Sequence, residues 1–276
     1  LVYASRFADD FADAVGFGWE KTEPRFDWAR LIAAKDKEIA RLEAIYRNGQ
    51  VRAGVTIFDE RAEVAGPTSV RLVRSGRKVT AGKILIATGG RPYVDPKLVG
   101  REHAITSDQA FHLAELPRHV VIEGGGYIAV EFAGIFHGLG AETTIVYRGD
   151  KILRGFDDDL RDALTEELTA RGIRIVTGSV IQGIEKNGEG LRARLGSGMV
   201  IEADQVMLAI GRRPLTEGLG LEAAGVALGA QGEIAVDAQS RTSVPSIYAI
   251  GDVTDRINLT PVAIREGHAF ADSVFG

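Results

Sequence analysis

The stretch that decides the fold is Val-Val-Ile-Glu-Gly-Gly-Gly-Tyr-Ile-Ala, residues 120–129. A strand-like apolar run leads into the pattern G-x-G-x-x-A, and a helical pattern follows as far as Leu139. Gly124 allows the tight turn, Gly126 lets a pyrophosphate approach the backbone, and Ala129 lets the helix sit close to the strand. The free N–H groups at the start of the helix would hold the diphosphate. The stretch therefore predicts a dinucleotide-binding turn, and a plain glycine turn is the alternative.

Strand and helix patterns alternate downstream of this turn. A second strand is expected at 143–146, a helix around 160–168 and a third strand at 173–176. This order predicts parallel pairing with right-handed crossovers, which is half of a doubly wound α/β sheet. Two hairpins follow, with turns at Asn187-Gly188 and Ser197-Gly198, and an apolar strand is expected at 206–210.

Two glycine- and proline-containing breaks, 88–92 and 211–214, divide the chain. Upstream of the first break, apolar residues at helical spacing predict a helix over 27–47, with Asp27 as its N-cap and Gly49 as its stop. The chain also begins within a stretch that has a helical pattern. Other short strands are expected at 55–58, 69–73, 83–87, 234–236 and 246–250.

The end of the second expected strand indicates which dinucleotide binds. NAD sites usually carry an acid there, which bonds the ribose 2′-hydroxyl. This chain instead has Tyr147-Arg148, with Arg154 six residues further on. A guanidinium can bind a 2′-phosphate through two charge-assisted hydrogen bonds, so the pattern favours NADP. The alternative is that Arg148 and Arg154 are solvated surface residues.

The composition is that of a globular protein. The chain has 276 residues, of which 45% are hydrophobic and 26% charged, with a net charge of −5. These values are typical of a globular protein and give no reason to expect nucleic acid or a membrane as partner. A cytoplasmic location is the default expectation. The chain has no cysteine and so can form neither a disulfide nor a redox dithiol.

Five ordered motifs resemble the glutathione-reductase group of pyridine nucleotide-disulfide oxidoreductases. The motifs occupy residues 87–92, 124–134, 209–214, 248–253 and 259–263. The resemblance implies a Rossmann-like NADP-binding domain inserted in a partial FAD-binding domain, with a parallel sheet and a β-meander. The implied boundaries are 1–92 for the partial FAD-binding domain, 93–213 for the NADPH-binding domain and 214–276 for the return to the FAD-binding domain.

The resemblance also implies binding residues, each with a simpler structural alternative. For NADPH the implied residues are Gly124, Gly125, Gly126, Tyr127, Ile128, Ala129, Glu131, Arg148, Arg154, Gly211 and Asn258. For FAD they are Ala62, Thr88, Gly89, Arg212, Asp252 and Thr260. Tyr46 is implied for the substrate pocket.

The implied roles differ among these residues. Tyr127 would cover the nicotinamide pocket, or would simply be an aromatic at a helix start. Glu131, the one implied catalytic residue, would lie near flavin and nicotinamide and pair with an upstream lysine, or would be a solvated helix residue. Asp252 would bond the ribityl chain of FAD, or be a turn aspartate. Tyr46 would line the pocket or join the core. His268 departs from the pattern, because some members carry an arginine there for the glutathione carboxylate.

The resemblance implies a reductase that passes a hydride from NADPH to FAD, and then electrons through a cysteine pair to glutathione disulfide. The cysteine pair, the FAD fingerprint and the interface domain with its catalytic histidine are expected outside this chain, which would be truncated at both ends and inactive alone. The intact protein is expected to be a homodimer that serves redox homeostasis. The alternatives are a stand-alone NADP-binding module and a lipoamide- or mercuric-type reductase.

Overall fold

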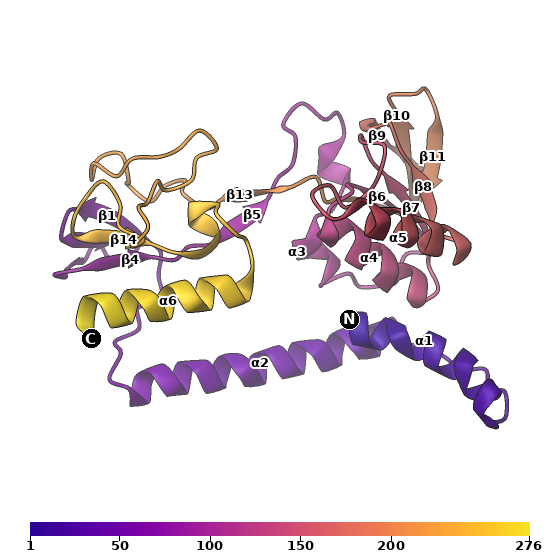
Figure 1. The fold of residues 1–276 in the computed structure, drawn as a ribbon, viewed down its shortest axis with the longest axis horizontal. Coiled ribbons are helices and arrows are strands. Elements are labelled where there is room, and N and C mark those ends of the chain that lie inside the picture. Colours follow the sequence, from indigo (N-terminus) through magenta and orange to yellow (C-terminus); the bar gives the residue numbers. More distant parts are fainter. The chain divides into compact units, whose positions relative to one another are not determined.

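The computed structural model describes residues 1–276, which form two compact units. Unit 1 comprises Leu1–Arg47 and Pro92–Gly211, and unit 2 comprises Asn48–Arg91 and Arg212–Gly276. Unit 1 includes residues 1–47, which the motifs implied to be part of the FAD-binding domain, 1–92. Its second segment differs from the expected 93–213 by one residue at the start and two at the end. Figure 1 labels many of the helices and strands of each unit.

The helices have the following bounds: α1 Val2–Ala14, η1 Val15–Phe17, α2 Trp28–Arg52, η2 Arg101–His103, α3 Ser107–Ala110, α4 Tyr127–Gly138, α5 Asp158–Ala170, η3 Gly251–Thr254 and α6 Thr260–Phe275. None of them combines the length and apolarity that a membrane span requires.

The strands have the following bounds: β1 Ala62–Gly66, β2 Ser69–Leu72, β3 Lys78–Thr80, β4 Ile84–Ile86, β5 Gly90–Pro92, β6 His119–Glu123, β7 Glu142–Val146, β8 Arg174–Val176, β9 Ile181–Asn187, β10 Gly190–Leu195, β11 Val200–Ala203, β12 Gln205–Leu208, β13 Arg212–Pro214 and β14 Ile247–Ala249.

Unit 1 is built on a four-stranded parallel sheet with strand order β12-β6-β7-β8. Helix α4 connects β6 to β7 and helix α5 connects β7 to β8, as the alternating sequence pattern predicts. An antiparallel meander, in the order β11-β10-β9, follows the third strand. Its turns contain Gly188 and Gly198, both with positive φ, so the two expected hairpin turns are confirmed.

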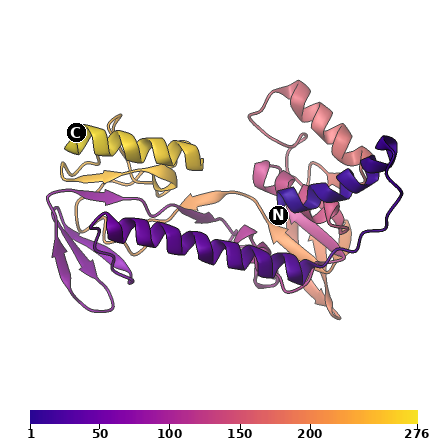
Figure 2. The same ribbon diagram turned by 90° about the horizontal axis from the view of Figure 1, so that it is seen from below.

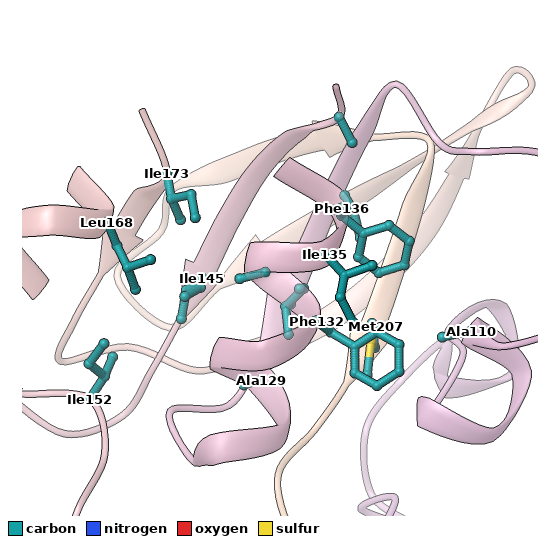
Figure 3. Close-up of a cluster of buried hydrophobic side chains, with 14 of the residues drawn as sticks. Ala110, Ala129, Phe132, Ile135, Phe136, Ile145, Ile152, Leu168, Ile173 and Met207 are labelled. Carbon is teal, nitrogen blue, oxygen red and sulfur yellow. The ribbon is translucent and has the colours of Figure 1, made fainter. Parts of the chain in front are cut away.

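The parallel sheet is covered on both faces by apolar side chains. On one face Ile122, Ile145 and Met207 pack with Phe132 and Phe136 of α4 (Figure 3). On the other face, alternate strand residues pack against the meander; they include Val121, Val146, Val206 and Leu208. Strands buried on both faces read as continuous apolar runs, which explains the absence of polar alternation in residues 120–122.

Helix α2 begins as the sequence predicts and ends later. The N–H of Arg30 donates to Asp27 Oδ1 at 3.0 Å, which confirms Asp27 as the N-cap. The expected stop at Gly49 is wrong, because α2 continues to Arg52 and the chain turns at Gly54, whose φ is +80°. Trp28, the buried residue of this helix, donates its indole N–H to the carbonyl oxygen of Leu113 at 2.8 Å. Figure 2 shows the full length of α2.

Unit 2 contains the three-stranded antiparallel sheet β1-β2-β3 and the parallel pair β14-β4. Helix α6 packs on β14, and the rings of Tyr248 and Phe270 lie 5.0 Å apart at their centroids. Two expected strands are wrong. Residues 55–58 form a loop, and in 234–236 only Ile234 makes an isolated bridge, with Leu228. Neither segment has a continuous ladder partner; Val55 is 51% exposed, whereas Ile234 is fully buried.

Phe136 tests the core of unit 1, because its ring is fully buried and stacks on Trp28 at 6.3 Å between centroids. We expect Phe136→Ala to lower the free energy of unfolding by about 3–5 kcal/mol. Phe17→Ala, at a ring that is 86% exposed, should change it by less than about 0.5 kcal/mol. Urea unfolding followed by tryptophan fluorescence would measure both. Equal effects would contradict this assignment of the core.

Candidate dinucleotide site

The first glycine of the turn is required by a backbone contact. Gly124 has φ +141°, and a Cβ there would lie 2.2 Å from the carbonyl oxygen of Ala209. The same Cβ would lie 3.3 Å from the Cβ of Ala129, which is fully buried at the start of α4. Because any side chain would collide, β6 can enter α4 this closely only through glycine.

The third glycine leaves the start of α4 open. Gly126 is the N-cap residue of α4, and no side chain caps the helix. A Cβ at Gly126 would meet no atom within 4 Å. The first N–H groups of α4 therefore lack a capping acceptor, and they lie where an anion can approach the backbone. Ile128, the next residue of the predicted set, packs partly buried against the core.

The middle glycine is required by an aromatic ring. A Cβ at Gly125 would lie 2.5 Å from Cγ of Tyr147, and a Cβ at Gly149 would lie 2.6 Å from the same ring. The Tyr147 ring therefore packs directly on the turn. Leu153 adds a second tie, since its N–H donates to the carbonyl oxygen of Gly125 at 2.6 Å. Leu153 has φ +54°, a conformation that costs a leucine roughly 1–3 kcal/mol.

These two contacts bring the predicted arginines to the turn. Arg148 follows Tyr147 in the chain and Arg154 follows Leu153, so both backbones are held beside Gly125. Both arginines are exposed, and neither makes an ion pair or a side-chain hydrogen bond within the chain. Arg161 on α5, by contrast, binds Asp158 and the carbonyl oxygens of two residues. Arg148 and Arg154 are therefore available to an anionic ligand.

A buried carboxyl group lies immediately before the turn. Glu123 ends β6, is 7% exposed, and accepts the N–H of Ile181 at Oε1 with a distance of 3.0 Å. Burial raises the pKa of Glu123 to about 7; the Ile181 N–H opposes this shift and the negative charge of Asp95 adds to it. Glu123 therefore exists as both carboxylic acid and carboxylate near neutral pH.

The other predicted residues of unit 1 are accessible. Tyr127 is 42% exposed at the first position of α4, and Glu131 lies on the exposed side of the same helix with no ion pair. Gly211 has φ +143° and no atom within 4 Å of an added Cβ. Tyr46 is 73% exposed on α2, so the alternative that it joins the core is wrong.

Four of the residues predicted for FAD lie together in unit 2. The side chain of Arg212 donates to the carbonyl oxygen of Gly90 at 2.7 Å and lies 3.8 Å from Asp252 Oδ2. A Cβ at Gly90 would lie 3.4 Å from that of Asp252. Thr88 donates its hydroxyl to the carbonyl oxygen of Leu215 at 2.9 Å, and the carbonyl oxygen of Gly89 accepts the N–H of Leu215 at 2.9 Å. Residues 88–90, Arg212 and Asp252 thus form one polar cluster.

Three further predicted residues of unit 2 lie outside this polar cluster: Ala62, Asn258 and Thr260. Ala62 begins β1 and pairs with Leu72, and Thr260 is the exposed first residue of α6. Asn258 donates its amide to Asp255 Oδ1 at 3.0 Å, while its own Oδ1 is buried without a hydrogen-bond partner. A buried amide oxygen of this kind can accept a hydrogen bond from a ligand.

Comparison with known proteins gives the family. The model described as pyridine nucleotide-disulphide oxidoreductase matches residues 8–267. The chain belongs to this family. Glutathione reductase of Burkholderia cepacia is 51% identical, and that of Nostoc sp. is 47% identical, each over the whole of this chain. Among solved structures, the HOCl-induced flavoprotein disulfide reductase RclA from Escherichia coli superposes with a TM-score of 0.86 at 26% identity, over 100% of this chain.

The chain spans about three fifths of the length of these proteins. It covers 61% of the Burkholderia cepacia relative, 62% of the Nostoc relative and 61% of the Escherichia coli structure. The Rossmann-like fold expected from the motifs is confirmed, as is the membership of the disulfide oxidoreductase family.

Sequence reasoning assigned no role to three residues of the candidate site. Glu123 carried a signal, because a charged residue ends an otherwise apolar buried strand. Tyr147 stood at the position expected for a ribose-binding acid, but nothing in the sequence shows that its ring lies on Gly125. The positive φ of Leu153 leaves no trace in the sequence, since leucine rarely adopts it.

The contact between Gly125 and Tyr147 can be tested by paired substitutions. We expect Gly125→Ala to lower the free energy of unfolding by about 1–3 kcal/mol, because the added methyl group overlaps the ring. Gly126→Ala should cost about 0.5 kcal/mol or less, since its Cβ meets nothing. In a Tyr147→Ala background the cost of Gly125→Ala should largely disappear, as a double-mutant cycle by urea unfolding would measure. Additive costs would refute the contact.

Glu123 makes a prediction about stability and pH. The folded-state pKa of about 7 lies above the ordinary value of 4.5, so the bound proton stabilises the fold fully below pH 4.5. This stabilisation is lost as the pH rises from there through about 7. Glu123→Gln should therefore gain stability relative to the parent chain between pH 4.5 and pH 8, by up to about 3 kcal/mol. Urea unfolding midpoints of both proteins at pH 4.5 and pH 8 would measure this gain. If the difference in stability between the two proteins were the same at both pH values, the assignment of a buried carboxyl group would be contradicted.

Proposed function

We propose that this chain is the NADPH-binding part, with a portion of the flavin-binding part, of an FAD-containing disulfide reductase that acts on glutathione disulfide. One observation carries the proposal: two unpaired arginines adjoin the two residues that contact Gly125. Arg148 is next to Tyr147, whose ring lies on the turn, and Arg154 is next to Leu153, whose N–H bonds Gly125.

The site suits a dinucleotide with a 2′-phosphate. The open N-terminus of α4 at Gly126 offers backbone donors and a positive helix end to the pyrophosphate. Arg148 and Arg154 offer planar, permanently charged donors to the phosphate on the ribose. No carboxylate stands at 147 or 148, where an acid would favour the 2′-hydroxyl of NAD. Tyr127 and Gly211 are further proposed contacts of NADPH, with Asn258.

The polar cluster in unit 2 fits the proposed flavin. The side chains of Asp252 and Arg212 are about three-quarters buried, and Arg212 Nε lies 3.8 Å from Asp252 Oδ2. The other carboxylate oxygen of Asp252 is proposed to accept a hydrogen bond from a ribityl hydroxyl. A bound FAD would supply the hydride and electron transfer of the reaction, and the cysteine pair that this chemistry requires is absent from these 276 residues. Thr88, Gly89, Ala62 and Thr260 are proposed to contact the flavin nucleotide, and Glu131 to lie near its ring.

The substrate rests on the relatives rather than on geometry. The matched proteins of Burkholderia cepacia and Nostoc are both named glutathione reductase, and the exposed Tyr46 is the proposed substrate contact of this chain. A stand-alone NADP-binding module would leave the Arg212–Asp252 cluster without a ligand, which supports the reductase. The homodimer and the cytoplasmic location stay predictions.

Substitution of the two arginines tests the cofactor assignment. Arg148→Gln with Arg154→Gln should weaken NADPH binding by about 100-fold or more, because two charge-assisted bonds of about 1.5–3 kcal/mol each are lost. NADH binding should change by less than about threefold. Calorimetric titration of this chain would measure the binding of NADPH and of NADH. The control is Arg118→Gln with Arg192→Gln, which removes two exposed charges elsewhere in unit 1. Equal losses for NADPH and NADH would overturn the phosphate role.

A further inference from the structure

Glu123 joins the parallel sheet, the meander and the glycine turn. Its carbonyl oxygen accepts the N–H of Ala209 at 2.7 Å, and its carboxylate accepts the N–H of Ile181, the first residue of β9. The next residue in the chain is Gly124, which begins the turn. A change in the charge of Glu123 therefore acts on the backbone that would cradle a pyrophosphate.

The surroundings of this carboxyl group contain no compensating cation. Its partners in register are Val146 on β7 and Leu208 on β12, and its neighbour on β9 is Ile181, all apolar. The charged group that acts on it is Asp95, in the segment between β5 and η2, and this charge is of the same sign. A carboxylate in such a place has one hydrogen bond and no ion pair to offset its burial.

We propose that Glu123 couples dinucleotide binding to proton uptake: the neutral carboxylic acid accompanies the bound dinucleotide, and its ionisation weakens binding. The inference rests on the proposed function, because it assigns the turn at Gly124–Gly126 to the pyrophosphate. Bound pyrophosphate brings further negative charge beside a group already buried near Asp95. Since the attraction or repulsion of charges is strong where water is excluded, the complex favours the protonated form.

The linkage has a defined direction. In the free chain the pKa of Glu123 is about 7, so above neutral pH the group is mostly carboxylate. The dinucleotide raises the pKa further, and each molecule that binds then takes up as much as one proton at Glu123. Above pH 7 the dissociation constant for NADPH should rise with pH, with a limiting slope of about tenfold per pH unit.

Calorimetric titration with NADPH tests this, at pH 8 in two buffers with different ionisation enthalpies. The parent chain should take up a larger fraction of a proton per NADPH than Glu123→Gln, which keeps an acceptor for the Ile181 N–H but cannot ionise. Between pH 7 and 8.5 the affinity of the parent chain for NADPH should fall several-fold relative to the affinity of Glu123→Gln for NADPH. Titration of the 2′-phosphate itself is common to both proteins and cancels in this difference. Glu142→Gln, which removes an exposed carboxylate at the opposite end of β7, should behave as the parent chain.

Asp95→Asn provides a second test that leaves the carboxyl group in place. Without the neighbouring charge, the fall in affinity should begin at a lower pH than in the parent chain. Equal proton uptake and equal pH dependence in the parent chain and Glu123→Gln would overturn the inference and leave the NADPH site intact. If Glu123→Gln does not fold, an unmoved pH dependence in Asp95→Asn overturns it. Failure of the parent chain to bind NADPH at any pH would overturn the proposed function as well.

Discussion

The packing of the Tyr147 ring on Gly125 is the contact on which the candidate site depends. A β-carbon at Gly125 would lie 2.5 Å from the ring, so the middle glycine of the turn is as constrained as the first. The ring fixes the end of β7 against the turn, and the bond from the Leu153 N–H to the Gly125 carbonyl oxygen fixes the following loop. Two arginines with no partner in the chain are thereby held beside the open start of α4. A flexible loop would have to lose conformational entropy on binding to achieve the same arrangement.

The sheet that carries this turn is held from both sides, and the two sides differ in chemistry. Helix α4 packs on one face through a cluster of apolar side chains, which include Phe132 and Phe136 with Met207 of β12 (Figure 3). The meander packs on the other face through apolar side chains, and Glu123 adds a polar contact with the Ile181 N–H. A buried carboxyl group is costly unless neutral or paired. Its position next to the glycine turn is what makes its protonation relevant to a charged ligand.

The chain belongs to the pyridine nucleotide-disulphide oxidoreductase family and spans about three fifths of the length of the proteins it matches. Unit 1 contains the glycine turn, the helix α4 and the loop that carries Arg148 and Arg154. Unit 2 contains the Arg212–Asp252 cluster and the buried amide oxygen of Asn258, which accepts no hydrogen bond within the chain.

The sequence by itself determined the parallel sheet, the glycine turn, the hairpins of the meander and the candidate arginines. These features follow from local rules: apolar periodicity, the lack of a side chain at glycine, and charge at a strand end. It misplaced the end of α2 and two short strands, because tertiary contacts decide whether an apolar run continues as regular structure. Only the tertiary structure decided why Gly125 is glycine, why Leu153 adopts a left-handed conformation and why Glu123 holds its proton near neutral pH. Each of these depends on atoms distant in the chain, such as the ring of Tyr147 and the N–H of Ile181, whose approach no local pattern encodes.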